Sequence, residues 1–212
     1  MKQPMPDTCA LVACTVCVEA VHRLEHEKVH GEGTFKCMAT TPYKLLIECL
    51  RDRIWIPRKG ANVGAVLAKI QQMGGVAITG APTPTLPLHS WKEHRWDDSD
   101  GGLSPERAAA LLDSHGPCVG VLWVCPWYFE FDAGIDDVLV YRGCGRSEVD
   151  RRESWDLYRS EGVGSHAVVC FAYRFCGGQM HVLVRDNHSA VANGPQRWID
   201  VEELDTLYTL SV

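Results

Sequence analysis

Apolar residues in the first half of the chain recur at helical spacing. Residues 9–31 are apolar on every face as far as Val18 and amphipathic beyond it. This pattern predicts a long helix whose first half is buried and which ends at a glycine. Capping residues, prolines and glycines at the ends of other apolar stretches predict three further helices, at residues 40–53, 62–77 and 104–117.

The second half of the chain changes to strand-like patterns. Runs of β-branched and aromatic residues between glycine, aspartate and asparagine turns predict strands at residues 118–131, 136–143, 166–175, 180–186 and 196–212. Residues 81–104 are rich in proline, serine and aspartate and are expected to form a loop. Helices followed by strands predict an α+β protein with two lobes, and a functional site is expected in the cleft between them.

The composition is that of an ordinary globular protein. The chain has 212 residues, of which 46% are hydrophobic and 23% charged, and its formal net charge is −6. Because there is no long basic run, nucleic acid and anionic membranes are not expected partners. Residues 9–18 form the longest apolar stretch, which is too short to span a bilayer, and residues 1–7 lack the apolar core of a signal peptide.

The cysteines bear on the compartment in which the protein works. As written, the chain is expected to be cytoplasmic, and vacuolar, lysosomal or extracellular if it is a processed fragment. Several of its ten cysteines lie in apolar stretches that suit buried thiols, whereas others lie nearer turns and could form disulfides, namely Cys49, Cys144 and Cys176. The spacing leaves the pairing open, and a reduced protein with mostly free cysteines is the expectation.

Cys9 and His166 form a candidate catalytic pair. Cys9 begins the first helix, where the helix dipole and unpaired N–H groups lower the pKa of a thiol. His166 begins a buried strand, and the hairpin that follows returns to Asp186 and Asn187. A thiolate beside an imidazolium is the activated nucleophile of cysteine acyl transfer. Either Asp186 or Asn187 could orient the imidazole from its second nitrogen.

The order of these segments resembles that of the papain-like cysteine peptidases. In that family the nucleophilic cysteine begins a long central helix, and a glutamine six positions upstream donates to the oxyanion; Gln3 stands six positions before Cys9. The segments "YRGC", "GSHAVVCFAY" and "HVLVRDN" look like the family's turn before the histidine, its histidine strand and the strand that ends in the orienting asparagine. The order is more diagnostic than a Cys–His pair alone.

The resemblance implies one papain-like peptidase domain over residues 1–212. A helical N-terminal lobe would cover about residues 1–81 plus a linker, and an antiparallel, β-barrel-like C-terminal lobe would cover about residues 103–212. The implied activity is that of a cysteine-type endopeptidase working through an acyl-enzyme intermediate, with no cofactor and no metal. Its partners would be peptide or protein substrates and protein inhibitors, without nucleic acid or membrane, and it would be a monomer.

The resemblance also implies a role for each site residue. Cys9 would be the nucleophile and His166 the acid and base, Gln3 would complete the oxyanion hole, and Asp186 would orient His166, with Asn187 as the alternative. The substrate-binding positions of the family fall on four further residues, Lys59, Gly60, Ser165 and Ala167.

The chain departs from the family pattern close to these positions. Ala10 follows the cysteine where the family has tryptophan, and Lys59 replaces the first residue of a double glycine that lines the cleft. Asp186 aligns with the orienting asparagine, and His188 aligns with the tryptophan that shields this asparagine from water. These departures raise a second hypothesis, a catalytically impaired pseudoenzyme that binds peptides or proteins. Its candidate contacts are Trp91, Trp96 and Trp127, although core packing is the favoured role of Trp127.

A zinc site is a third hypothesis. Cys14 and Cys17 are two residues apart, and three histidines follow on the same predicted helix, namely His22, His26 and His30. Helix geometry argues against it. At about 100° per residue the cysteines face the core, whereas the histidines share a solvated stripe.

Overall fold

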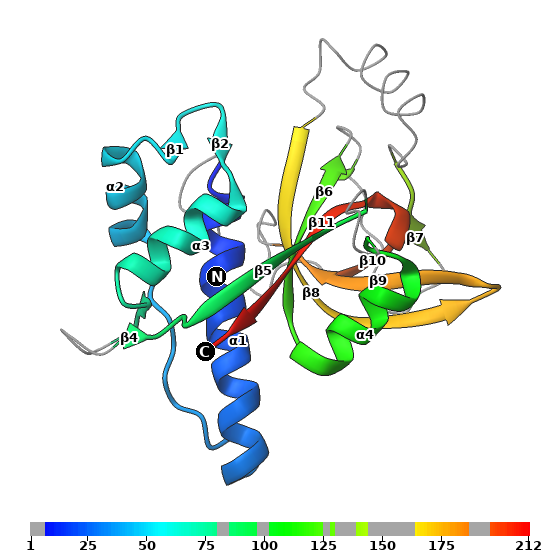
Figure 1. Cartoon of the computed structure of the whole chain (residues 1–212), viewed down its shortest axis with the longest axis horizontal. Coiled ribbons are helices and arrows are strands. Elements are labelled where there is room, and N and C mark those ends of the chain that lie inside the picture. Colours follow the sequence, from blue (N-terminus) through cyan, green and yellow to red (C-terminus); the bar gives the residue numbers. More distant parts are fainter. Residues whose placement is uncertain are drawn as a thin grey trace.

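A long central helix organises the first half of the protein. The computed structural model describes residues 7–79, 85–96, 102–124, 128–129, 139–143, 164–186 and 196–212. Helix α1 (Cys9–His30) lies between α3 (Val63–Gln72) and the large sheet (Figure 1). Its residues from Ala10 to Val18 are buried with the single exception of Val16, as an all-round apolar pattern requires. The predicted helix and its buried first half are therefore confirmed.

The remaining elements of the helical lobe are short. Helix α2 (Tyr43–Arg51) has Pro42 at its N-cap position, and α3 is capped by Asn62, whose side chain accepts a hydrogen bond from Ala65 N. Two small antiparallel sheets complete the lobe, one made of β1 (Trp55–Ile56) and β2 (Gly60–Ala61), the other of β3 (Val76–Ala77) and β4 (Thr85–Leu86).

Seven strands form the sheet of the second lobe. Their order is β5-β11-β6-β8-β9-β10-β7, and every neighbouring pair is antiparallel except β10 and β7. The strands are β5 (Ser90–Arg95), β6 (Cys118–Val124), β7 (Val140–Tyr141), β8 (Gly164–Cys176), β9 (Gln179–Arg185), β10 (Gln196–Asp200) and β11 (Leu204–Ser211). The α+β fold is confirmed. Within the described strands the sheet stays open between β5 and β7, so the expected barrel is not closed.

The centre of the sheet is covered on both faces. Successive side chains of a strand point to opposite faces, and Val119 and Val169 accordingly pack with α1, whereas Leu122 and Val168 pack with α4 (Pro105–His115). This two-sided burial explains why β6 and β8 are nearly continuous apolar runs in the sequence. It also fixes α1, and with it Cys9, against β8.

The loop expected at residues 81–104 contains a strand. Ser90–Arg95 forms β5, which pairs along its whole length with β11 at one edge of the sheet. Five of its six residues are polar or charged on a half-exposed edge strand, so its sequence, SWKEHR, lacks the apolar signal of a core strand. No helix in the described part of the chain has the length and apolar character needed to cross a membrane.

Burial of α1 predicts a large stability effect at Leu11. This side chain is fully buried, so Leu11→Ala should lower the free energy of unfolding by about 2–5 kcal/mol. Val29, near the end of the same helix, is 77% exposed, and Val29→Ala should change it by less than about 0.5 kcal/mol. Urea unfolding followed by circular dichroism measures both variants, and equally small effects would contradict a buried α1.

Candidate active site

The segment before Cys9 is anchored to the β1–β2 turn. Asp7 has a positive φ of 62°, its carbonyl accepts a hydrogen bond from Trp55 Nε1 at 2.8 Å, and its carboxylate accepts one from Arg58 N at 3.2 Å. Gly60 has a φ of 75°, and a Cβ built there would lie 3.5 Å from Asp7 O. The backbone around Gly60 therefore sits directly beside the start of α1 and suits glycine.

The structure brings Cys9 and His166 together. Cys9 is the first residue of α1, and His166 is the third residue of β8, opposite Leu122 of β6. Their side chains are hydrogen-bonded to each other. The His166 ring is buried, while Cys9 remains partly accessible. A partly accessible thiol beside a buried imidazole suits attack on a ligand that enters from solvent.

Asp186 binds the other side of the His166 ring. The β8–β9 hairpin places Arg185 opposite Val169, so the residue after β9 returns beside the start of β8. Asp186 Oδ1 lies 3.0 Å from His166 Nε2, and its side chain is wholly buried. Asn187, the alternative orienting residue, and Gln3, the expected oxyanion donor, lie outside the described residues.

These contacts shift the pKa values of both partners toward a charged pair. Burial by itself would raise the pKa of the Cys9 thiol, but the hydrogen bond and charge of His166, with the N–H groups of Ala167 and Ala10, lower it below its ordinary value. Burial likewise opposes the charged form of His166, yet the hydrogen bonds with Asp186 and Cys9 raise the pKa of its imidazole to about 10. Both shifts are thus in the direction that favours a thiolate beside an imidazolium.

Two aromatic rings cover the buried side of the pair. The ring centroids of Tyr128 and Phe129 lie 5.6 and 5.5 Å from that of His166. Tyr128 is fully buried, and burial together with the nearby Asp186 carboxylate raises the pKa of its phenol. His188, which the sequence aligns with the shielding tryptophan, lies outside the described residues. In the sequence, the run of aromatic residues at 127–129 was the sign of these two covering rings that our sequence analysis missed.

A cleft opens in front of the Cys9–His166 pair. Its volume is about 250 Å³, and residues of both lobes line it. All four predicted substrate-binding residues lie on its wall together with the pair itself, namely Lys59, Gly60, Ser165 and Ala167. Two hydrogen-bonded pairs in its lining were not foreseen: Trp123 donates its indole N–H to Asp205 Oδ1 at 3.1 Å, and Tyr208 donates its hydroxyl to Glu93 Oε1 at 2.9 Å.

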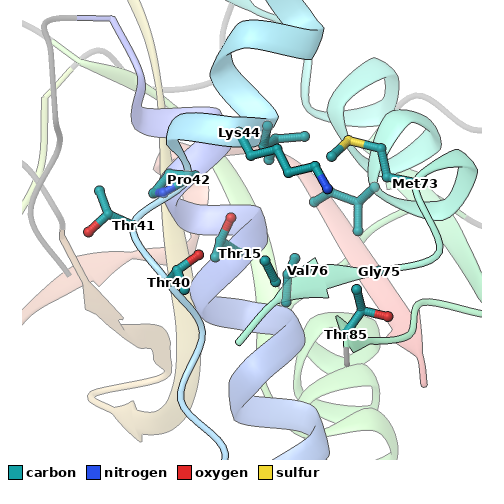
Figure 2. A pocket seen from close by; sticks show the side chains of 12 residues that line it. Thr15, Thr40, Thr41, Pro42, Lys44, Met73, Gly75, Val76 and Thr85 are labelled. Carbon is teal, nitrogen blue, oxygen red and sulfur yellow. The ribbon is translucent and has the colours of Figure 1, made fainter. Parts of the chain in front are cut away.

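A smaller cavity lies between α1, α2 and the β3–β4 sheet. Figure 2 shows hydroxyl and aliphatic side chains around it, among them Thr15, Pro42, Met73 and Thr85. Its volume is about 40 Å³, which leaves room for little more than a water molecule. The Thr15 hydroxyl already donates to Leu11 O at 2.8 Å. This cavity is a packing gap and not a second substrate site.

The tryptophans proposed as contact residues of a binding module take part in packing. The Trp91 ring lies 6.0 Å from that of Tyr208, and Trp96 Nε1 donates to Leu204 O at 2.6 Å. Neither is among the fully exposed side chains, and Trp127 lies outside the described residues. Among the described tryptophans, Trp123 lines the cleft.

The side chains considered for zinc point in different directions. Cys14 and Cys17 are fully buried in the core, and His22 hydrogen-bonds to Pro87 O at 2.8 Å. His26 and His30 stack on each other at the surface. In the described part of the chain, no three His, Cys, Asp or Glu side chains are grouped as metal ligands. The eight cysteines that the structure describes are free thiols.

Comparison with known proteins identifies the fold. No family model matches the sequence, and no curated protein matches it. The whole chain aligns with a structure from work on the mite allergens Blo t 1 and Der p 1, with a TM-score of 0.65 and 13% identity, and spans 66% of that chain.

Two digestive procathepsins from the larval midgut of Tenebrio molitor are also similar. Procathepsin L2 has a TM-score of 0.58 and 14% identity over 94% of this chain and 61% of its own. Procathepsin L 3 has a TM-score of 0.60 and 10% identity over 100% of this chain and 67% of its own. These structures are papain-like cysteine peptidases, so the chain has the papain-like fold that the order of its segments predicts.

The hydrogen bond between Cys9 and His166 predicts how thiol reactivity depends on pH. Because His166 lowers the pKa of Cys9, His166→Ala should move the midpoint of Cys9 alkylation by iodoacetamide to higher pH. His22→Ala, on the same helix as Cys9 but bonded to Pro87, is the matched control and should leave the midpoint in place. Mass spectrometry of the peptide that contains Cys9 measures the rate, with the exposed Cys37 as internal reference. An equal midpoint in wild type and His166→Ala would contradict the ion pair.

Proposed function

We propose that this protein is a cysteine-type endopeptidase whose nucleophile is the Cys9 thiolate. The observation that carries the proposal is the connected series Cys9–His166–Asp186, whose first two members line a cleft of about 250 Å³. A low thiol pKa, a protonated imidazole and a buried orienting carboxylate are the requirements of nucleophilic cysteine catalysis. The papain-like fold supports the same reading, since it provides a cleft between two lobes at this position.

In the first half of the reaction, Cys9 Sγ attacks the carbonyl carbon of the scissile peptide bond. The new C–S bond converts the carbonyl oxygen into an oxyanion, and the backbone N–H of Cys9 at the helix start, with Gln3, would stabilise it. Asp186 occupies Nε2 of His166, so the proton on Nδ1 is the one delivered to the leaving amine. The C–N bond then breaks and leaves a thioester on Cys9.

In the second half, water hydrolyses the thioester. His166, neutral after it has protonated the amine, takes a proton from the attacking water, and the C–S bond breaks to release the carboxylic acid. The thiolate and the imidazolium are then restored. Asp186 stabilises the charged imidazole throughout and keeps Nδ1 facing the sulfur, because Nε2 is held by its carboxylate.

The substrate would lie along the cleft between β2 and the start of β8. Gly60 leaves its backbone uncovered by a side chain, and Ser165 and Ala167 flank His166 on the facing wall. Lys59 stands at the rim, where a bulky exposed side chain narrows the approach. Backbone groups at these positions suit recognition of an extended peptide, whose own N–H and C=O groups need partners.

Removal of the nucleophile should abolish turnover. We expect Cys9→Ser to lower kcat/KM for a fluorogenic peptide by at least about a thousandfold, because a serine hydroxyl is not ionised by His166. Cys176→Ser, at an exposed thiol far along the sheet, is the matched control and should retain wild-type activity. Peptide binding without hydrolysis by the wild type would favour the pseudoenzyme instead, and loss of activity in Asn187→Ala but not in Asp186→Ala would transfer the orienting role to Asn187.

The pH profile of kcat/KM should be bell-shaped. Activity rises with pH as Cys9 ionises and falls as His166 loses its proton, and the pKa of His166 is raised to about 10, so the falling limb is expected there. Asp186→Asn removes the carboxylate that raises this pKa, so the falling limb should move to lower pH. Asp113→Asn, at an α4 carboxylate that accepts a hydrogen bond from Tyr173, should not move it. A falling limb unchanged in Asp186→Asn would contradict the role given to Asp186.

A further inference from the structure

A buried arginine stands behind Asp186. Arg197 belongs to β10, opposite Val184 of β9, and its side chain is only 4% exposed. Its Nη2 lies 3.9 Å from Asp186 Oδ2, on the side of the carboxylate that faces away from His166. An arginine is almost never buried unless it is paired. The carboxylate of Asp186 is therefore flanked by two cationic groups, the imidazole of His166 and the guanidinium of Arg197.

The guanidinium is held in place by Tyr128. Arg197 Nη1 donates to Tyr128 O at 2.5 Å, and Arg197 Cζ lies 4.5 Å from the centroid of the Tyr128 ring. The same ring packs against His166. Hydrogen bonding and stacking fix the planar guanidinium, which a flexible ammonium group could not reproduce as well. Arg197 thus cannot turn away from Asp186 without giving up both contacts.

Charge balance in this buried cluster depends on Arg197. A thiolate and an imidazolium sum to zero, so a neutral amide beside them needs no counter-ion. The carboxylate of Asp186 adds a negative charge, and a buried uncompensated charge is strongly disfavoured. With Arg197 included, the cluster has two negative and two positive groups and is neutral again.

We infer that Arg197 is a positioning residue that neutralises Asp186 and so allows Cys9 to remain a thiolate beside protonated His166. The catalytic consequence rests on the proposed function, but the charge coupling does not. Without Arg197 the cluster would carry a net negative charge, and the least costly relief is uptake of a proton by Cys9.

Among the residues that the structure describes, the other titratable groups near the pair do not replace this balance. Burial raises the pKa values of Cys14 and Tyr128, so both stay neutral. The charged residues on the cleft wall lie on the solvent side, where water screens them, namely Asp7, Lys59, Glu93, Arg95 and Asp205.

A double-mutant cycle on Arg197 and Asp186 tests the inference. The readout is the pH midpoint of Cys9 alkylation by iodoacetamide, which requires no peptidase activity. Arg197→Met should raise the midpoint by about one pH unit or more, and Asp186→Asn alone should not raise it. The double variant removes one charge of each sign, so its midpoint should return close to that of the wild type.

If Arg197 had a purely structural role, the alkylation midpoint of the double variant would not return to that of the wild type. In that case the alkylation midpoint of the double variant would be as high as that of Arg197→Met, and this result would overturn the inference. If Arg197→Met does not fold, the double variant should fold, because no unpaired charge is left buried; failure of both to fold would also overturn it. Arg174→Met, which removes an arginine stacked 4.1 Å from the Trp198 ring on the same sheet, is the matched control and should leave the midpoint in place.

The same measurements separate this inference from the proposed function. A wild-type protein that hydrolyses no peptide, but in which the midpoint shifts and returns as described, would refute the peptidase and leave the role of Arg197 intact. Arg197→Lys retains the charge without the planar fork, and its midpoint should fall nearer to that of the wild type than to that of Arg197→Met.

Discussion

The hydrogen bond between His166 and Asp186 is the constraint on which the site depends. It joins the start of β8 to the residue after β9, and therefore requires the register that places Arg185 opposite Val169. It fixes the imidazole ring, favours its charged form, and leaves one ring nitrogen for Cys9. A shift of this register by one residue would turn Asp186 to the other face of the sheet. Packing of α1 against β8 then only has to bring the thiol within reach.

A carboxylate at this position changes what the surrounding protein must supply. An amide can orient an imidazole without a counter-ion, whereas a buried carboxylate needs one. In this protein the counter-ion is Arg197 on β10. Tyr128 and Phe129, in the segment after β6, cover the pair. At 10–14% identity, what this chain shares with the similar structures is the fold.

Local patterns were enough to predict the helices and the hairpin after His166, whereas the pairing of Cys9 with His166 was a hypothesis that the family resemblance supported. A helix that begins at Cys9 and a hairpin that returns from His166 to Asp186 are short-range features, so spacing and apolar periodicity predict them. Long-range features were missed. The edge strand β5 is mostly polar, and Arg197 reaches Asp186 only through the pairing of β9 with β10. The sequence of β10, QRWID, has only two apolar residues, so it gave no sign that Arg197 is buried.

The central claim of the proposed function is that Cys9 Sγ forms a thioester with the acyl half of a substrate. This thioester can be measured by mixing the protein with a peptidyl nitrophenyl ester, quenching in acid and locating the acyl group by mass spectrometry. We expect the acyl group on the peptide that contains Cys9, and absent from those that contain the exposed Cys37 and Cys176. Ester hydrolysis with no acyl group on Cys9, or acylation spread over the exposed thiols, would contradict a Cys9 nucleophile.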